Sequence, residues 1–202
     1  MRLYIPVMIS ASAIVLSGCP ASETGSDGGS QPAIESIHTA LRAPTCRQEI
    51  DRSDPNDTPY LVCPGVAGYS LIVRRVEAGR QSIDVVNPEQ QAFPLDYDEL
   101  VTRYMASLDS TAEWRVDTSD GTQVPIALVV RVHAREDNDE PAEVTHVYWA
   151  VAKISPDEAC VTDRIPEGER SATEVRSAAD TARERPCASP QPSITANGAA
   201  IR

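Results

Sequence analysis

Four cysteines place the strongest constraint on what this chain can fold into: Cys46, Cys63, Cys160 and Cys187. In an oxidising compartment an even number of cysteines predicts disulfides, and four cysteines allow three connectivities. We favour Cys46–Cys63 with Cys160–Cys187, because the members of each pair are close in sequence and flank a segment rich in turn residues. Each closed loop contributes about 3 kcal/mol to stability in the chain-entropy model. A zinc site is the alternative, but there is no CxxC spacing and no histidine nearby.

The N-terminal segment predicts export. Met1 and Arg2 form a short positive region, residues 3–16 are mostly apolar, and Leu16-Ser17-Gly18-Cys19 closes the segment. The apolar run is too short to span a bilayer as a mature helix, and the small residues before position 19 suit a signal peptidase. We therefore expect residues 1–18 to be a signal peptide that delivers the chain to an oxidising envelope.

The tetrapeptide at residues 16–19 resembles the lipobox of bacterial lipoproteins. The resemblance implies that Cys19 receives a diacylglyceryl thioether, becomes the new N-terminus and is N-acylated. Several acyl chains, such as palmitate, give stable membrane anchoring where a single chain binds only marginally. Pro20 follows the cysteine and no Asp does, which in the family's sorting rule favours the outer membrane and a domain facing the periplasm. An ordinary secretory signal with a chance cysteine is the alternative.

Composition divides the rest of the chain into three parts. Residues 19–33 are small, polar and rich in Gly and Ser, which predicts a flexible tether. Residues 188–202 contain two prolines, one glycine and no apolar periodicity, which predicts a disordered tail. Residues 34–187 remain as a single folded domain, which is long enough to bury a core.

The charge balance is strongly acidic. The chain has 18 basic and 30 acidic side chains, a formal net charge of −12. A nucleic-acid binder needs a clustered basic surface to neutralise phosphates, so this class is excluded. An acidic surface steers a protein toward cationic partners instead.

Hydrophobic periodicity predicts an α+β domain: a mainly antiparallel sheet with two to three helices packed on it, stapled by two disulfides. Apolar residues at helical spacing predict a short helix from Ile34 to Leu41 and a second from Asp96, as N-cap, to Leu108. A capping box at residues 171–174 predicts a third helix, which Pro186 ends. Strands are expected at residues 60–63, 68–76, 80–86, 112–116, 124–133, 144–154 and 159–162.

Short motifs occur along the chain in a definite order: Glu35-Ser36-Ile37-His38-Thr39, Cys63-Pro64-Gly65 with Gly68-Tyr69, Arg80-Gln81-Ser82, Glu113-Trp114-Arg115, Pro125-Ile126-Ala127 with Arg131, Val151-Ala152-Lys153-Ile154, Cys160-Val161 and Ala178-Ala179-Asp180. Their order resembles an uncharacterised family of small exported proteobacterial proteins with two cysteine pairs. The resemblance covers residues 35–187. The resemblance implies a shared fold, but it implies neither an activity nor catalytic residues.

Two polar loops contain residues that bind metal ions in other proteins. His133 and His146 bracket a loop that carries Asp137, Asp139 and Glu140, and a facing histidine pair there could hold a divalent ion weakly. The favoured interpretation is an ordinary solvent-exposed hairpin loop that holds no metal ion. A second loop carries Asp51, Asp54, Asn56 and Asp57, but it lacks the spacing and the glycine of an EF-hand, so a solvated loop is again favoured. We therefore predict neither a metal nor a cofactor.

The segment Glu113-Trp114-Arg115 is the main candidate for ligand binding. On a strand, Glu113 and Arg115 share one face while Trp114 points to the other, so we expect Trp114 in the core. Arg115 could then hold a carboxylate or an anionic sugar together with Arg131. The alternative is that these charged side chains form ion pairs across neighbouring strands and bind no ligand.

Two classes of function remain. The chain has no GxSxG, P-loop, GxGxxG or HExxH motif, so a non-enzymatic, lipid-anchored binding module of the envelope is favoured, with a basic protein or an envelope glycan as partner. One version is an inhibitor of a cationic enzyme such as lysozyme. The second class is a hydrolase that uses carboxylates such as Asp84, Glu113 or Asp163 for acid–base chemistry with an arginine.

Overall fold

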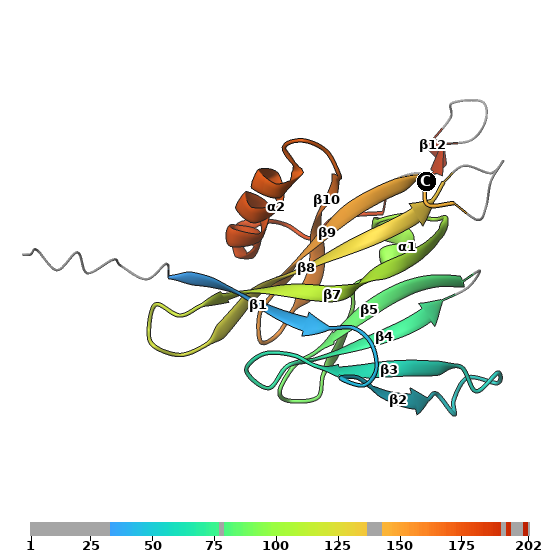
Figure 1. The fold of residues 1–202 in the computed structure, drawn as a ribbon, viewed down its shortest axis with the longest axis horizontal. Helices are drawn as coiled ribbons and strands as arrows, with labels where there is room; N and C mark the ends of the chain where they lie inside the picture. Colours follow the sequence, from blue (N-terminus) through green and yellow to red (C-terminus); the bar gives the residue numbers. More distant parts are fainter. Residues whose placement is uncertain (1–32, 77–78, 137–142, 191–192, 195–199, 202) are drawn as a thin grey trace, which may run out of the picture. The chain divides into compact units, whose positions relative to one another are not determined.

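The computed structural model describes residues 33–76, 79–136, 143–190, 193–194 and 200–201. The predicted signal peptide, Cys19 and the predicted tether up to residue 32 lie outside these ranges. The described residues form two five-stranded antiparallel sheets, here called sheet A and sheet B, that pack face to face (Figure 1). The antiparallel architecture predicted from the sequence is confirmed, although the strands divide into two layers.

Sheet A has the strand order β1-β7-β8-β9-β10. Its members are β1 (Ile34–Ala40), β7 (Met105–Asp117), β8 (Val124–Arg135), β9 (His146–Ile154) and β10 (Ala159–Pro166). The strand β8 is buried on both faces, as its continuous apolar run from Ile126 to Val130 predicts. This strand is therefore the centre of the sheet in packing as well as in order.

Sheet B has the strand order β2-β3-β4-β5-β6 and is a meander. Its members are β2 (Arg47–Ile50), β3 (Pro59–Pro64), β4 (Ser70–Val76), β5 (Arg80–Val86) and β6 (Ala92–Pro94). Leu71 and Val73 of β4 pair with Val85 and Ile83 of β5 and point into the main core. The residues between them face outward, because successive side chains of a strand point to opposite faces.

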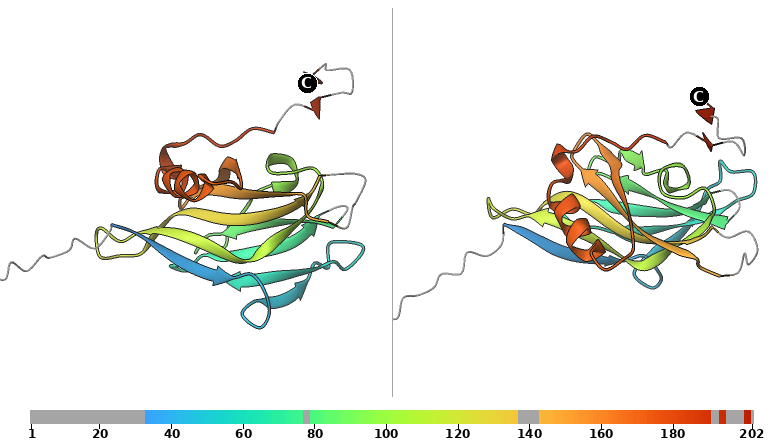
Figure 2. Two further views of the ribbon diagram at one scale, coloured as in Figure 1. Left: turned by 45° about the horizontal axis from the view of Figure 1, so that its top comes forward. Right: turned by 90° about the horizontal axis from the view of Figure 1, so that it is seen from above.

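The helix α2 (Ser171–Asp180) covers the face of sheet A that points away from sheet B (Figure 2). Its buried Val175, Ala178 and Ala179, with Ala182 in the following 3₁₀ turn η2 (Ala182–Glu184), pack on Ala127, Val129 and Val151 of the sheet. The small side chains on this face of α2 let the helix lie close to the sheet. Two further short strands, β11 (Ser193–Ile194) and β12 (Ala200–Ile201), pair with each other in the tail.

The predicted disulfide connectivity is confirmed. Cys46 and Cys63 are joined with a Cα–Cα distance of 4.2 Å, and Cys160 and Cys187 with 5.6 Å. The first bond links Cys46, directly before β2, to Cys63 of β3, so it joins two neighbouring strands of sheet B. The second bond holds the segment after η2 to β10, where the backbone N–H of Ala188 also donates to the carbonyl of Val161.

Helix content is lower than predicted, because one predicted helix is a strand and a second is helical only from Tyr97 to Leu100. The predicted helix from Ile34 to Leu41 is the edge strand β1, which pairs with β7 from Ile34↔Asp117 to Ala40↔Thr111. The helical spacing of its apolar residues was misleading. A strand that can complete a sheet gains a ladder of hydrogen bonds, and this tertiary gain outweighs a weak local preference.

The predicted helix from Asp96 to Leu108 is also wrong in extent. Only α1 (Tyr97–Leu100) is helical, and Asp96 precedes it in a left-handed conformation without a side-chain cap. From Met105 onward the chain is β7, paired with β8. Tyr97 and Val101 reach the core as the pattern predicts, but Tyr104 and Met105 are exposed.

The third predicted helix is confirmed as α2, but its predicted capping box does not form. Arg170 occupies the N-cap position without a side-chain cap, and Ser171 lies inside the helix. The Ser171 hydroxyl donates to the carbonyl of Gly168 at 2.8 Å. The serine therefore closes the preceding turn rather than the helix end.

The two disulfides differ in exposure, which predicts different ease of reduction. Cys63 is fully buried and Cys46 is 6% exposed, whereas Cys187 is exposed. Because an attacking thiolate must reach a disulfide sulfur, mild thiol treatment of the native protein should open Cys160–Cys187 first. Differential alkylation followed by peptide mass spectrometry measures the order. Equal rates in denaturant provide the control, and earlier reduction of Cys46–Cys63 in the native protein would contradict the prediction.

Candidate functional site

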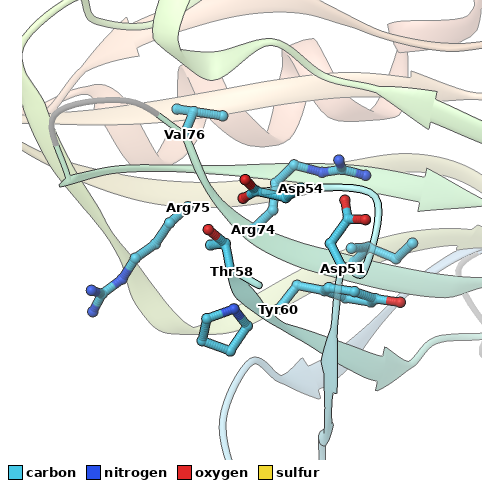
Figure 3. A pocket seen from close by; sticks show the side chains of 9 residues that line it. Asp51, Asp54, Thr58, Tyr60, Arg74, Arg75 and Val76 are labelled. Carbon is cyan, nitrogen blue, oxygen red and sulfur yellow. The ribbon is translucent and has the colours of Figure 1, made fainter. Parts of the chain in front are cut away.

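A cavity of about 340 Å³ opens on the outer face of sheet B (Figure 3). The loop between β2 and β3 folds over strands β3 and β4 to form it. The lining residues are Asp51, Asp54, Thr58, Pro59, Tyr60, Ile72, Arg74, Arg75 and Val76. This volume lies at the lower end of the range of about 300–1,000 Å³ that is usual for small-molecule sites.

An ion pair with a buried carboxylate holds one charged group of the cavity in place. Arg74 pairs with Asp84 of the neighbouring strand β5, and the Asp84 side chain is only 3% exposed while that of Arg74 is 41% exposed. A buried carboxylate is costly unless it is paired, so Asp84 constrains where the guanidinium of Arg74 lies. The Nε–H of Arg74 is buried and has no hydrogen-bond partner.

Two carboxylates of the covering loop face the same cavity. The Oδ1 atom of Asp51 accepts from the backbone N–H of Ser53 at 2.9 Å and from its hydroxyl at 2.5 Å. These bonds, the hydroxyl first, lower the pKa of Asp51 below its ordinary value. The pKa of Asp54 is lowered by hydrogen bonds from the Thr58 side chain and then from the Asn56 backbone. Both groups are therefore ionised at neutral pH and suit charge recognition better than proton donation.

The wall next to these carboxylates is aromatic. The Tyr60 hydroxyl donates to Glu49 Oε2 at 2.8 Å, and this bond is the largest cause of a raised pKa for Tyr60. Glu49 is itself paired with Arg47 on the same strand. The hydroxyl of Tyr60 is thus directed along sheet B, while the ring lines the cavity.

The residues Glu113, Trp114 and Arg115 divide between two faces of sheet A as predicted. Trp114 is fully buried, and its indole N–H donates to Thr39 Oγ1 at 3.0 Å. The Arg115 side chain is 5% exposed on the opposite face and donates from Nε to Asp180 at 2.7 Å. It also donates to the Ser36 hydroxyl and lies 3.5 Å from Glu113. Arg115 therefore contacts three groups of this chain, and its bond to Asp180 links α2 to the sheet.

Arg131 lies on the same face of sheet A but does not join Arg115. It pairs with Glu167, lies 3.9 Å from Asp109, and places its guanidinium 5.5 Å from the ring centroid of Trp149. Ala127 is the β8 partner of Arg115, four positions from Arg131, a separation of about 13 Å along the strand. The predicted pair of arginines therefore does not converge on one ligand carboxylate.

Glu113 instead lines a small groove beneath α2. This groove has a volume of about 130 Å³ and includes Trp149, Val175 and Arg176. It lies below the usual size of a small-molecule site. Glu113 is one of the three residues predicted from the sequence to bind a ligand, and it borders this hollow.

The prediction that His133 and His146 face each other is wrong, because the register of β8 and β9 differs from the predicted one by one residue. His133 pairs with Val147 and His146 with Ala134. A shift of one position turns a side chain to the other face of a sheet, so the two imidazoles do not meet. The predicted acidic partners Asp137, Asp139 and Glu140 lie outside the described residues.

Near His146 the structure contains a polar network that the sequence analysis missed. Glu136 accepts hydrogen bonds from the hydroxyls of Thr102 and Tyr148, each at 2.9 Å, and lies 3.5 Å from Arg164 and 3.7 Å from His146. Burial and then the bond to Glu136 raise the pKa of Tyr148 to about 12. The members lie on separate elements with no motif spacing, so no sequence signal could have found them.

The three carboxylates predicted as candidates for a hydrolase lie in different parts of the fold. Asp84 faces the outer side of sheet B, Glu113 lies beneath α2, and Asp163 is paired with Arg185 at 2.5 Å. Acid–base catalysis on a glycosidic bond needs two carboxylates about 5–10 Å apart across one cleft. None of the three shares a cleft with another of them.

Metal-ligating side chains converge at one place within the described part of the chain. The ligand atoms of Glu158, Cys160 and Cys187 lie within 4.8 Å of one another. The two sulfurs are joined in a disulfide and so are not thiolate ligands. Asp51, Asp54 and Asp57 do not form such a group among the residues that the structure describes.

Comparisons with protein-family models, curated proteins and solved structures find no match to this chain. Across the described ranges, no helix has the length and apolar character needed to cross a membrane.

The contacts of Arg115 with Asp180, Ser36 and Glu113 predict a structural role for it. Arg115→Ala removes the partner of Asp180 and Glu113, and should lower the free energy of unfolding by about 2–3 kcal/mol. Arg131→Ala, whose partners are more exposed, should cost about 1 kcal/mol or less. Urea unfolding followed by tryptophan fluorescence measures both variants. An Arg115→Ala protein as stable as the parent would show that Arg115 does not hold α2.

Proposed function

We propose that this protein is a lipid-anchored binding module of the bacterial envelope, that it faces the periplasm, and that the cavity on sheet B is its ligand site. The two disulfides indicate an oxidising, extracytoplasmic environment. The lipobox-like segment that ends at Cys19 supports a lipid anchor, and Pro20 after it supports sorting to the outer membrane.

The observation that carries the proposal is the chemistry of the cavity. The cavity has the volume of a small-molecule site and contains Arg74, whose guanidinium is paired with Asp84. It also contains the carboxylates of Asp51 and Asp54, whose pKa values are lowered. Catalysis by a carboxylic acid at neutral pH needs a raised pKa, so the lowered values support recognition of charge over hydrolysis. A preformed pocket with a few fixed polar groups is typical of binding sites.

A second candidate function is inhibition of a cationic enzyme that attacks the envelope, such as lysozyme. The ionised carboxylates of Asp51 and Asp54 favour it, because a basic side chain of such an enzyme could enter the cavity mouth. Binding would then depend steeply on salt. A carboxylate-dependent hydrolase lacks comparable support.

The anchor predicts a change in location when its cysteine is removed. Intact-mass spectrometry of the parent should show an N-terminal diacylglyceryl and acyl modification, and Cys19→Ala should lack it and leave the membrane fraction. Cys187→Ala is the matched control, because it removes a different cysteine and should stay in the membrane fraction. Unchanged partitioning of the Cys19→Ala protein would overturn the lipid anchor.

The binding site predicts where a partner can be trapped. A photo-crosslinking amino acid at Thr58, which lines the cavity, should capture an envelope component in living cells. The same group at exposed Val124 of sheet A should not. Combining the Thr58 probe with Asp51→Asn and Asp54→Asn should abolish capture, since both substitutions remove charge while keeping shape. Equal capture at Thr58 and Val124, or capture that is insensitive to the two asparagines, would contradict this site.

A further inference from the structure

We propose that the cavity on sheet B binds a small zwitterion, an amino acid or a short unblocked peptide, with its carboxylate at Arg74 and its ammonium group at Asp51 and Asp54. This inference depends on the proposed function and names the class of ligand. It uses the fact that one cavity holds fixed groups of both signs.

The cationic part of the site is a guanidinium whose position is set by another residue. Asp84 engages Nη2 of Arg74 from the neighbouring strand. An arginine has five N–H donors in a planar fork, and Asp84 uses one side of that fork. An incoming carboxylate matches the remaining donors of Arg74 in geometry and in charge.

The anionic part of the site is the loop that covers the cavity. Asp51 accepts both bonds from Ser53 through Oδ1, which leaves Oδ2 to accept from a ligand. Asp54 lies on the same loop, and its Oδ1 accepts from the Asn56 backbone N–H at 2.9 Å and from the Asn56 side chain at 3.2 Å. These internal bonds hold the loop in shape, so the carboxylates are arranged for an ammonium group before it arrives.

The mixed charge decides between ligand classes. A simple anion would approach Arg74 against the repulsion of three carboxylates, and a simple cation would meet the guanidinium of Arg74. A zwitterion satisfies both sets of groups in one cavity. The volume of about 340 Å³ limits the ligand to a small one. Tyr60, Ile72 and Val76 supply apolar surface for a side chain or methyl group. Figure 3 shows Arg75 at the rim with its guanidinium directed away from the other lining groups, so it is not part of the assigned contact.

The test is isothermal titration calorimetry of the purified full chain with four probes. These are alanine, Ala-Ala, N-acetyl-Ala-Ala, which lacks the ammonium group, and Ala-Ala amide, which lacks the carboxylate. We expect binding of alanine or Ala-Ala, and at least about tenfold weaker binding of each blocked form, since each loses a charge-assisted contact. Alanine and Ala-Ala separate a free amino acid from a peptide end as the source of the zwitterion.

Variants connect this result to the cavity. Asp51→Asn and Asp54→Asn should each weaken binding of the better unblocked probe by about tenfold. Asp57→Asn is the matched control, because Asp57 is on the same loop, does not line the cavity and has a left-handed backbone that asparagine tolerates. Arg74→Lys keeps a charge for Asp84 but loses the planar fork, and should weaken Ala-Ala more than Ala-Ala amide.

Three outcomes would overturn the inference, and the first of them separates it from the proposed function. Absence of heat with alanine and Ala-Ala at millimolar concentration, while the Thr58 probe still captures an envelope component, leaves the binding module and removes the zwitterion. Equal affinity for blocked and unblocked probes also removes it, because neither terminal charge is then recognised. Loss of both dipeptide binding and Thr58 capture would remove the site altogether.

Discussion

Burial of Trp114 between the two sheets is the interaction on which the rest of the structure depends. The indole belongs to β7 of sheet A, donates to Thr39 on β1, and lies 6.1 Å from the ring of Tyr69, which precedes β4 of sheet B. Gly65 makes this contact possible, since a Cβ there would meet Trp114 and the carbonyl of Tyr69, each at 2.7 Å. One large side chain therefore sets the spacing between the sheets and the position of the edge strand.

The alternation of a strand then places the charged neighbours of Trp114. Glu113 and Arg115 must point away from the sheet–sheet core, toward α2. There Arg115 becomes a structural partner of Asp180, and α2 closes over Ala127, Val129 and Val151. The face that looked most like a ligand site in the sequence is thereby used to attach a helix. The cavity arises on the other layer, where the loop of Asp51 and Asp54 lies over Arg74 (Figure 3).

Local patterns predicted well wherever the chain is buried on both faces or constrained by short loops. The strands around Ile126–Val130 and the small-residue face of α2 follow directly from apolar content and spacing. The patterns were misleading at the ends of sheets. Ile34, Ile37 and Leu41 have the spacing of a helix, but the exposed edge of β7 offers them a ladder. The histidine pair failed for a related reason, because symmetry in a hairpin cannot distinguish two registers that differ by one residue.

The sequence by itself predicted export, favoured the disulfide pairing that forms, and indicated the antiparallel class and the core position of Trp114. These depend on composition, sequence proximity and alternation, which are local properties. Only the tertiary structure decided that Asp84 lies beneath Arg74, that Asp51 and Asp54 share a cavity with it, and that Arg115 is buried. Each of these facts joins residues on different elements. Their distances depend on how the sheets, the loop and α2 pack, and no short spacing in the chain encodes that packing.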